Sequence, residues 1–202
     1  MEDNNSKVSE AAGSKGYLRD EEKSEKKLYT VEDWLSWDEN VRSELLEGEL
    51  IMLAQPTARH QSILLEIAGQ LWQFLKGKPC KVFMAPFGVR LFENENTAFE
   101  PDIVVICDKE KLDDRICHGA PDMVIEILSP STARMDRGQK YIKYQQAGVR
   151  EYWIVDPDLN LLQAGVLKEG SYITTVYEAN DTANVAILEG CQINLSDVFR
   201  DD

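Results

Sequence analysis

The chain has 202 residues, of which 43% are hydrophobic and 29% are charged, values typical of one globular domain with a sizeable core. No run approaches the roughly 20 apolar residues that a membrane-spanning helix needs. The segment Met1 to Asn5 has neither the basic start nor the apolar centre of a signal peptide. We therefore expect an intracellular protein of the cytoplasm that does not engage a membrane.

The overall charge is strongly acidic, because 36 Asp and Glu face 22 Lys and Arg, for a formal net charge of −14. This disfavours nucleic acid as a partner, since phosphates are bound mainly by Lys and Arg. Two stretches are locally basic: residues 76–90 hold four basic residues and no acid, and residues 127–150 hold five basic residues and one acid. They could form a basic face or be solvated helix faces, so charge leaves the partner open.

The four cysteines, Cys80, Cys107, Cys117 and Cys191, lie far apart in a chain with two histidines. Zinc sites draw on closely spaced pairs of ligands, and this chain has no Cys-x-x-Cys pair. Cys107 ends an apolar run, which indicates a small buried residue. We predict reduced cysteines with a structural role.

The N-terminal part predicts a tail, a short helix and a hairpin. Residues 1–27 are polar and charged, and we expect them to form a disordered tail before a domain over residues 28–202. Thr30 begins a weak capping box for a short helix ending at Trp37. Ser43–Ile51 predicts a β-hairpin with its turn at Glu47-Gly48.

A long amphipathic helix and two short strands follow. Apolar residues recur at helical spacing from His60 to Leu75, and Gly77 ends the pattern. Val82–Met84 and Gly88–Phe92 are typical of short strands, and the segment from Glu93 to Thr97 is polar, as in a loop.

The centre of the chain predicts buried strands joined by a helix. Ile103–Cys107, which follows Asp102, and Met123–Leu128 are apolar on both faces, which is typical of central strands covered on both sides. Residues 108–120 form a charged connector with room for a short helix. Met135–Ala147 is compatible with a helix, and Glu151–Pro157 with another strand.

The C-terminal part predicts further β-structure, at Leu161–Val166, Tyr172–Tyr177 and Val185–Leu188, with a turn at Glu169-Gly170. Together the elements predict an α/β fold, with a mixed central β-sheet flanked by helices and additional antiparallel strands.

Two acids on the central strands are candidates for a metal site. Hydrolysis of a phosphodiester needs an activated water and relief of charge on the phosphate, and Mg²⁺ held by a few carboxylates supplies both. Asp102 and Glu126 sit on strands rigid enough to hold such a geometry. Asp122 lies about 13 Å from Glu126 at about 3.3 Å per strand residue, too far to share one ion. Residue spacing alone leaves a structural pair of acids equally open.

Seven segments taken together resemble one family. They are Ser43–Leu50 (SELLEGEL), Arg59–Gln61 (RHQ), Ala85–Leu91 (APFGVRL), Glu100–Asp102 (EPD), Gly119–Thr132 (GAPDMVIEILSPST), Asp136–Lys140 (DRGQK) and Gly148–Pro157 (GVREYWIVDP). The chain is similar, over about residues 28–200, to the restriction-endonuclease-like family within the PD-(D/E)XK nuclease superfamily. The ordered series, and the segment Gly119–Thr132 above all, is specific to that family.

The resemblance implies a restriction-endonuclease-like core that binds Mg²⁺, with Mn²⁺ as a substitute, and cuts DNA. Asp102 matches the Asp of the Pro-Asp element and Glu126 the acid of the Glu-x-Lys element, so both would be metal ligands. Leu128 stands where the superfamily has its lysine, and the resemblance implies that Lys140 from the next helix replaces it as the catalytic lysine. Glu44 matches an acid near the first hairpin and would help to hold the metal.

Alternatives remain for these residues. Lys143 is a second candidate for the lysine, either lysine could lie on a helix surface, and Glu44 could pair with a base across the hairpin. His60 and Gln61 match a pair in the family without an assigned role. The missing lysine at position 128 also fits a catalytically silent DNA-binding or regulatory module, and the acidic charge fits a hydrolase of another phosphodiester. The superfamily makes a homodimer plausible.

Overall fold

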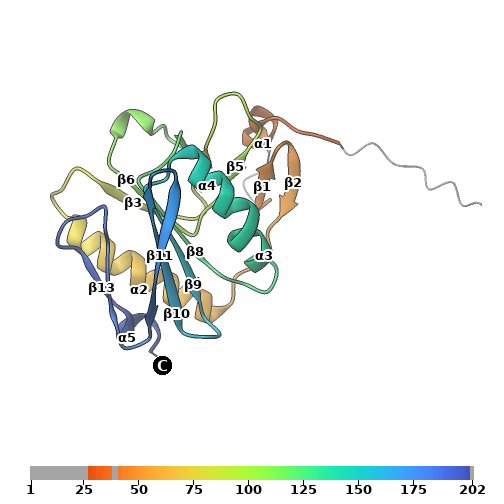
Figure 1. The fold of residues 1–202 in the computed structure, drawn as a ribbon. Helices are drawn as coiled ribbons and strands as arrows, with labels where there is room; N and C mark the ends of the chain where they lie inside the picture. The colour runs from red at the N-terminus through yellow and green to blue at the C-terminus, as the bar shows by residue number, and fades with distance from the viewer. Residues whose placement is uncertain (1–26, 38–40, 201–202) are drawn as a thin grey trace, which may run out of the picture.

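The computed structural model describes residues 27–37 and 41–200. The predicted tail therefore lies, apart from Lys27, outside the described residues. The fold is α/β, with mixed sheets flanked by helices (Figure 1). None of the helices in the described ranges is long and apolar enough to cross a membrane.

A six-stranded sheet forms the centre of the molecule. Its strands, in spatial order, are β11 (Ser171–Glu178), β10 (Leu161–Lys168), β9 (Glu151–Asp156), β8 (Met123–Ile127), β6 (Ile103–Ile106) and β3 (Lys81–Met84). The pair β8–β9 is parallel and the other pairs are antiparallel. Every residue of β6 and β8 is buried, which confirms that the two apolar runs are strands covered on both faces.

A second sheet packs beside the first. Its order is β2 (Glu49–Met52), β1 (Ser43–Leu46), β5 (Ala98–Phe99), β4 (Gly88–Arg90) and β7 (Ile116–His118). The β1–β2 hairpin turns at Glu47 and Gly48, both with positive φ, as predicted. The short strands β5 and β7 were not expected from the sequence. A further pair, β12 (Thr182–Asn184) and β13 (Gln192–Asn194), lies near the C-terminus.

Helices cover both faces of the six-stranded sheet (Figure 1). Helix α2 (Ala58–Leu75), capped by the Thr57 side chain, covers one face together with α5 (Leu195–Val198). On the other face lies a continuous helical segment made of α3 (Ala133–Met135), the π-helical turn η2 (Asp136–Lys140) and α4 (Tyr141–Ala147), which Gly148 ends with a φ of 88°. The capping box at Thr30 begins helix α1 (Val31–Ser36), and a short 3₁₀ turn, η1 (Lys109–Lys111), follows β6.

The alternation of side chains along β8 produces two cores. Ile125 and Ile127 pack in the cluster that contains α2, whereas Val124 and Leu128 pack with Tyr144 of α4 and with the second sheet. Because side chains alternate in a strand, Glu126 lies on the α4 side. A parallel pair such as β8–β9 needs a crossover connection, and here the crossover is the helical segment that carries Lys140.

Two sequence predictions are wrong. Val185–Leu188 is not a strand but a turn, in which the Leu188 N–H donates to the Val185 carbonyl. Cys80 and Cys107 form a disulfide, whereas Cys117 and Cys191 are free and buried. The antiparallel register pairs Lys81 with Ile106. Cys80 directly precedes Lys81 and Cys107 directly follows Ile106, so the same register places the two cysteines opposite each other. Spacing along the chain does not reveal such a pair.

Candidate active site

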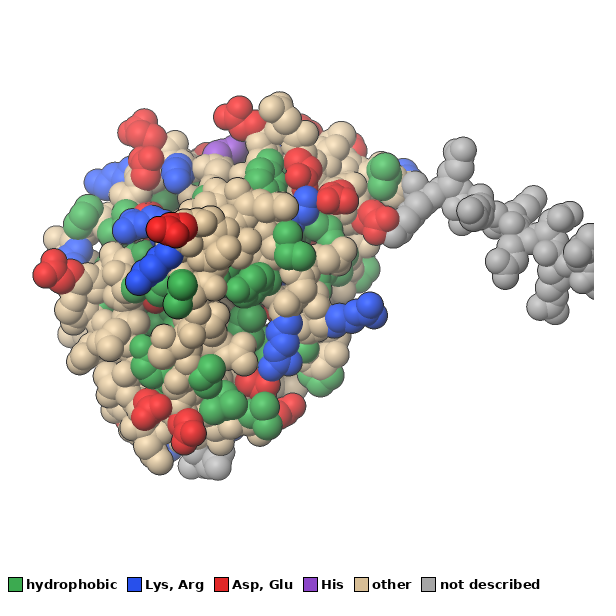
Figure 2. All heavy atoms as spheres, in the orientation of Figure 1, with side chains coloured by type: hydrophobic (Ala, Val, Ile, Leu, Met, Phe, Trp, Pro, Cys, Tyr) green, Lys and Arg blue, Asp and Glu red, His purple; other side chains and the backbone are tan. Residues whose placement is uncertain are grey.

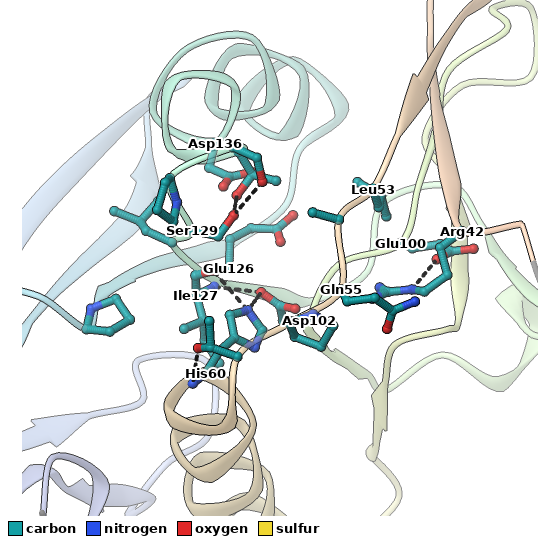
Figure 3. A pocket seen from close by; sticks show the side chains of 18 of the residues that line it. Arg42, Leu53, Gln55, His60, Glu100, Asp102, Glu126, Ile127, Ser129 and Asp136 are labelled. Atoms are coloured by element: carbon teal, nitrogen blue, oxygen red, sulfur yellow. Dashed lines mark hydrogen bonds and ion pairs between the residues drawn. The ribbon is translucent and has the colours of Figure 1, made fainter.

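A cavity of about 360 Å³ opens at the C-terminal end of β8 (Figure 3). Its walls come from five parts of the chain that are distant in sequence: the start of the hairpin, the segment that leads into α2 together with the first turn of α2, the segment entering β6, the stretch from β8 to η2, and the residues that follow β9. All four residues predicted to form the site, Glu44, Asp102, Glu126 and Lys140, line this cavity.

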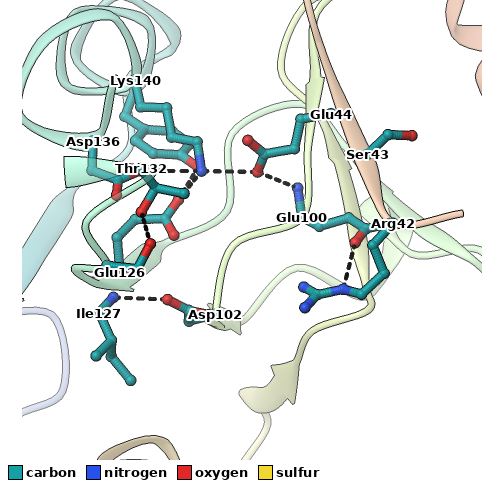
Figure 4. A network of polar contacts seen from close by, with 12 residues as sticks. Arg42, Ser43, Glu44, Glu100, Asp102, Glu126, Ile127, Thr132, Asp136 and Lys140 are labelled. Atoms are coloured by element: carbon teal, nitrogen blue, oxygen red, sulfur yellow. Dashed lines mark hydrogen bonds and ion pairs between the residues drawn. The ribbon is translucent and has the colours of Figure 1, made fainter. Parts of the chain in front are cut away.

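The cavity wall contains a buried cluster of three carboxylates around one ammonium group (Figure 4). Lys140 Nζ lies 2.8 Å from Glu44 Oε1, 3.0 Å from Glu126 Oε1 and 3.3 Å from Asp136 Oδ1. None of the four residues is more than 3% exposed. We call Glu44, Glu126, Asp136 and Lys140 the acid–lysine cluster.

The helical segment presents two charged residues and one tyrosine on one side, because residues four apart lie on the same face of a helix. Asp136, Lys140 and Tyr144 follow each other at four-residue intervals, and all three are buried. A π turn contains more residues per turn than an α-helix and often marks a functional site. The Tyr144 hydroxyl donates a hydrogen bond to Glu126 Oε1 at 2.8 Å, so Lys140 and Tyr144 hold the same carboxylate oxygen.

Burial and crowding of acids set the protonation of the cluster. Burial raises the pKa of Glu126 well above its usual value, and Lys140 offsets this only in part because Asp136, Asp102 and Glu44 lie nearby. Burial likewise raises the pKa of Asp136. Burial alone would lower the pKa of Lys140, but the surrounding carboxylates raise it well above its usual value, so this lysine stays charged.

Asp102 lies on the other side of the cavity and is fixed by two contacts through Oδ2. The Ile127 N–H donates to this oxygen at 2.8 Å, and His60 Nε2 lies 3.3 Å from it. His60 Nε2 is also 3.1 Å from the Ile127 carbonyl. Burial lowers the pKa of His60, but the contacts with Asp102 raise it more, for a net upward shift. His60 Nδ1 is buried, and no residue in the described ranges forms a hydrogen bond with it.

Arg42 and Glu100 complete the wall opposite His60 (Figure 3). Arg42 Nε lies 3.7 Å from Glu100 Oε2. Burial raises the pKa of Glu100 to about 7, although Arg42 pulls it down. The Glu100 backbone N–H donates to Glu44 Oε1 at 2.9 Å, and this hydrogen bond links the first hairpin to the segment that carries Asp102.

Two rival residues lie outside the cavity. Asp122 accepts a hydrogen bond from the Cys107 N–H and pairs with Arg150. Lys143 pairs with Glu47 and Glu95 at the edge of the second sheet, at 2.7 and 2.6 Å. The structure therefore brings Lys140, and not Lys143, to Glu126.

Sequence reasoning assigned no role to Arg42, Glu100, Asp136 or Tyr144. Three of them lie close to segments that carry the family resemblance. Arg42 directly precedes residues 43–50, Glu100 lies in residues 100–102, and Asp136 lies in residues 136–140. The signal that could have identified Asp136 and Tyr144 is their four-residue spacing from Lys140. Of the pair that opens α2, His60 lines the cavity, whereas Gln61 is exposed on the helix.

The two basic stretches do not form one face around the cavity. Lys76 and Lys78 lie over the rings of Trp72 and Phe74, at the end of α2 opposite to the cavity. In the second stretch Arg137 pairs with Asp156, and Lys140 is buried in the acid–lysine cluster. On the face shown in Figure 2, acidic and basic side chains are interspersed.

The donor set of the cavity suits a hard divalent cation, because carboxylate oxygens are the ligands that Mg²⁺ prefers. Glu44 Oε2 is buried and has no hydrogen-bond partner among the residues that the structure describes, so an oxygen ligand is available beside Glu126. Within the described residues, no three His, Cys, Asp or Glu side chains converge closely enough to hold a metal as they stand. The Lys140 ammonium bridges Glu44 and Glu126 in this arrangement.

The mixed sheet flanked by helices, with Asp102 directly before β6 and Glu126 on β8, agrees with the restriction-endonuclease-like α/β fold expected from the sequence. The chain belongs to the Uma2 family, described as "Putative restriction endonuclease", whose model matches residues 31–196. The family resemblance predicted from the sequence is thereby confirmed.

Two relatives from Synechocystis sp. (strain ATCC 27184 / PCC 6803 / Kazusa) carry no assigned function. The uncharacterized protein sll1609 is 27% identical over 135 residues, covering 64% of this chain and 76% of the relative. The uncharacterized protein slr1290 is 24% identical over 156 residues, and the match covers 74% of this chain and 80% of the relative.

The fold is shared with a solved structure of another protein. It is the crystal structure of a "putative nuclease belonging to DUF820" from Anabaena variabilis ATCC 29413, with a TM-score of 0.70 and 22% sequence identity. The match covers 85% of this chain and 97% of the other. This similarity confirms the predicted fold class.

Proposed function

We propose that this protein is a Mg²⁺-dependent endonuclease that hydrolyses phosphodiester bonds in DNA. The observation that carries the proposal is the buried acid–lysine cluster beside Asp102, in a cavity of a chain that belongs to a nuclease family. Asp102 and Glu126 would hold the metal, with Glu44 as an auxiliary ligand, and Mn²⁺ would substitute for Mg²⁺.

The bound metal would supply an activated water and neutralise charge on the phosphate. The residues of the chain would hold this chemistry in position. Tyr144 donates to Glu126, and the Ile127 N–H donates to Asp102, so each carboxylate presents its other oxygen in a fixed direction. Lys140 keeps a positive charge beside the acids, where it would stabilise negative charge developing on the phosphate.

A plasmid cleavage assay with Mg²⁺ and with Mn²⁺ tests this proposal. Asp102→Asn and Glu126→Gln retain the shape of each side chain and remove its charge. We expect each to reduce cleavage by roughly a hundredfold or more while the unfolding temperature stays within a few degrees. Glu151→Gln is the matched control, because Glu151 is a buried glutamate outside the cavity lining. Full cleavage by both cavity variants would refute the proposal.

A second candidate is a nuclease-fold module that binds DNA without cutting it, or regulates another protein. The contact of Lys140 with three carboxylates favours it, because a lysine so held cannot reach a phosphate without leaving them. Binding of DNA and divalent ions without cleavage, across several metals and substrates, would support this candidate. A panel including RNA and nucleotide phosphodiesters would identify a hydrolase of another substrate.

The partner that follows from this proposal is DNA. A homodimer remains a proposal from the superfamily resemblance, and size-exclusion chromatography with light scattering would measure it.

A further inference from the structure

Arg42 differs from the other cations that line the cavity. It directly precedes β1, and its guanidinium projects into the cavity from the wall opposite Ile127 (Figure 4). Its approach to Glu100, at 3.7 Å between Nε and Oε2, is longer than a hydrogen bond. Both of these atoms are buried, and neither has a hydrogen-bond partner within the described residues.

The remaining cations of the cavity are held by protein groups. Lys140 is held by three carboxylates. Arg59 donates from Nη2 to Asn160 Oδ1 at 2.7 Å and from Nε to the Pro157 carbonyl at 3.4 Å. His60 Nε2 faces the Ile127 carbonyl and Asp102. In the described part of the chain, Arg42 is therefore the cavity cation whose terminal nitrogens make no hydrogen bond to the protein.

The geometry of arginine suits one class of ligand here. A guanidinium presents two parallel N–H groups that match two oxygens of a phosphate, and arginine favours such bidentate binding over lysine. Glu100 lies on the Nε side of the guanidinium, so it leaves Nη1 and Nη2 directed away from the carboxylate. Glu100 also precedes Asp102 by two residues, and this short link ties the position of Arg42 to the proposed metal ligands.

We propose that Arg42 binds the non-bridging oxygens of the phosphodiester substrate, and that Glu100 orients its guanidinium through Nε. The substrate phosphate would then lie between Arg42 on one wall and the acid–lysine cluster on the other. This inference rests on the proposed function. It adds to that function the positively charged group, the Arg42 guanidinium, that lets a cavity rich in acids bind an anionic phosphodiester. Neither residue acts as a nucleophile or a base in this role.

The test measures binding of a fluorescent 20-base-pair DNA duplex (about two helical turns) in Ca²⁺, with Glu126→Gln in every protein to prevent turnover. Dissociation constants are determined over a series of salt concentrations. We expect Arg42→Gln to weaken binding by roughly tenfold to a hundredfold and to reduce the slope of log affinity against log salt by about one. Arg42→Lys should retain the slope, because it keeps the charge, while losing part of the affinity.

Arg150→Gln is the matched control, because Arg150 has the same charge and pairs with Asp122 at an exposed site away from the cavity. It should leave both affinity and slope unchanged. A slope in Arg42→Gln equal to that of the parent protein would overturn the inference while leaving the proposed function intact. Absence of DNA binding in Ca²⁺ by the protein with its native Glu126 would overturn both.

A structural role for Arg42 would give a different result. Removing Arg42 alone leaves the Glu100 carboxylate without its nearby positive charge, so the double variant Arg42→Gln, Glu100→Gln removes both charges together. If this double variant unfolds at the parent temperature and still shows the reduced salt slope, the effect belongs to the phosphate contact. A double variant that recovers the parent slope would overturn the inference.

Discussion

Two buried glutamates on neighbouring parallel strands show what distinguishes the cavity from the core. Glu126 on β8 and Glu151 on β9 are 3% and 0% exposed. Glu151 accepts hydrogen bonds from Trp153 Nε1 at 2.7 Å and from the Ile187 N–H at 2.9 Å. Glu126 instead contacts a lysine and a tyrosine, and it lines the cavity.

Burial raises the pKa of both glutamates, so burial alone does not mark a functional carboxylate. The difference lies in the neighbours. The hydrogen-bond partners of Glu151 are neutral N–H donors, and both of its oxygens accept from them. Glu126 has its two donors on a single oxygen, in a group of acids that outnumber their cation. Such an arrangement of repelling charges is unfavourable for a structural core and is typical of a ligand site.

The largest expected effect comes from removing the cation of the cluster. Lys140→Met should lower the free energy of unfolding by about 3–5 kcal/mol, because it leaves buried carboxylates without a positive partner. Urea denaturation at neutral pH measures this loss. Added Mg²⁺ or Ca²⁺ should restore part of the stability if the acids then bind the ion in place of the ammonium.

Lys143→Met is the matched control for that experiment. Lys143 lies on the same helix and pairs with two acids, but one of them, Glu47, is largely exposed. Pairs of this kind contribute about 1 kcal/mol or less, and added divalent ions should not change the result. Equal losses in the two variants would show that the cluster is an ordinary ion-pair network.

The second prediction compares two single variants, in which either Glu151 or Glu126 is replaced by glutamine. Glu151→Gln should lower the free energy of unfolding by about 1–3 kcal/mol, because its new amide group must face an N–H donor that then has no acceptor. Glu126→Gln should change it by less than about 1 kcal/mol, since the retained oxygen can still accept from Lys140 and Tyr144 and a repelling charge is lost.

Activity should follow the opposite order in these two variants. Glu151→Gln should cleave DNA like the parent protein, whereas Glu126→Gln should not. If both substitutions reduce stability and neither reduces cleavage, Glu126 is a structural carboxylate like Glu151.

The sequence was sufficient to predict the elements whose pattern is local. The β1–β2 hairpin follows from Glu47-Gly48, the end of α4 from Gly148, and the central strands from their apolar runs. It was not sufficient for β5 and β7, which are two and three residues long and depend on pairing with β4. The disulfide was missed for a similar reason, since it depends on the register between β3 and β6.

The candidate site could be predicted only in part. Asp102 and Glu126 interrupt or precede strongly apolar strands, and the family pattern identified Lys140 and Glu44. Arg42 and Glu100 could not be identified, because their place in the cavity arises from the second sheet folding against β8, whereas Asp136 could have been found only from its four-residue spacing to Lys140.

The smallest expected effect is a dependence of stability on pH at Glu151. Burial raises its pKa above the usual 4.5, and the N–H groups of Ile187 and Ala186 and of the Trp153 indole offset this only in part. The folded protein then holds this proton more tightly than the unfolded chain. The stabilising contribution of Glu151 is therefore complete below about pH 4.5 and is lost as the pH rises through the pKa of the folded state.

Urea denaturation of the parent protein and of Glu151→Gln between about pH 4 and pH 8 measures this contribution. The advantage of the parent over the variant should shrink as the pH rises. An advantage that grows with pH would mean that the N–H donors outweigh burial and lower the pKa. Glu151 would then be a buried carboxylate held ionised by N–H donors and by the nearby charge of Arg150, and the lysine beside Glu126 would be required by the crowding of acids rather than by burial.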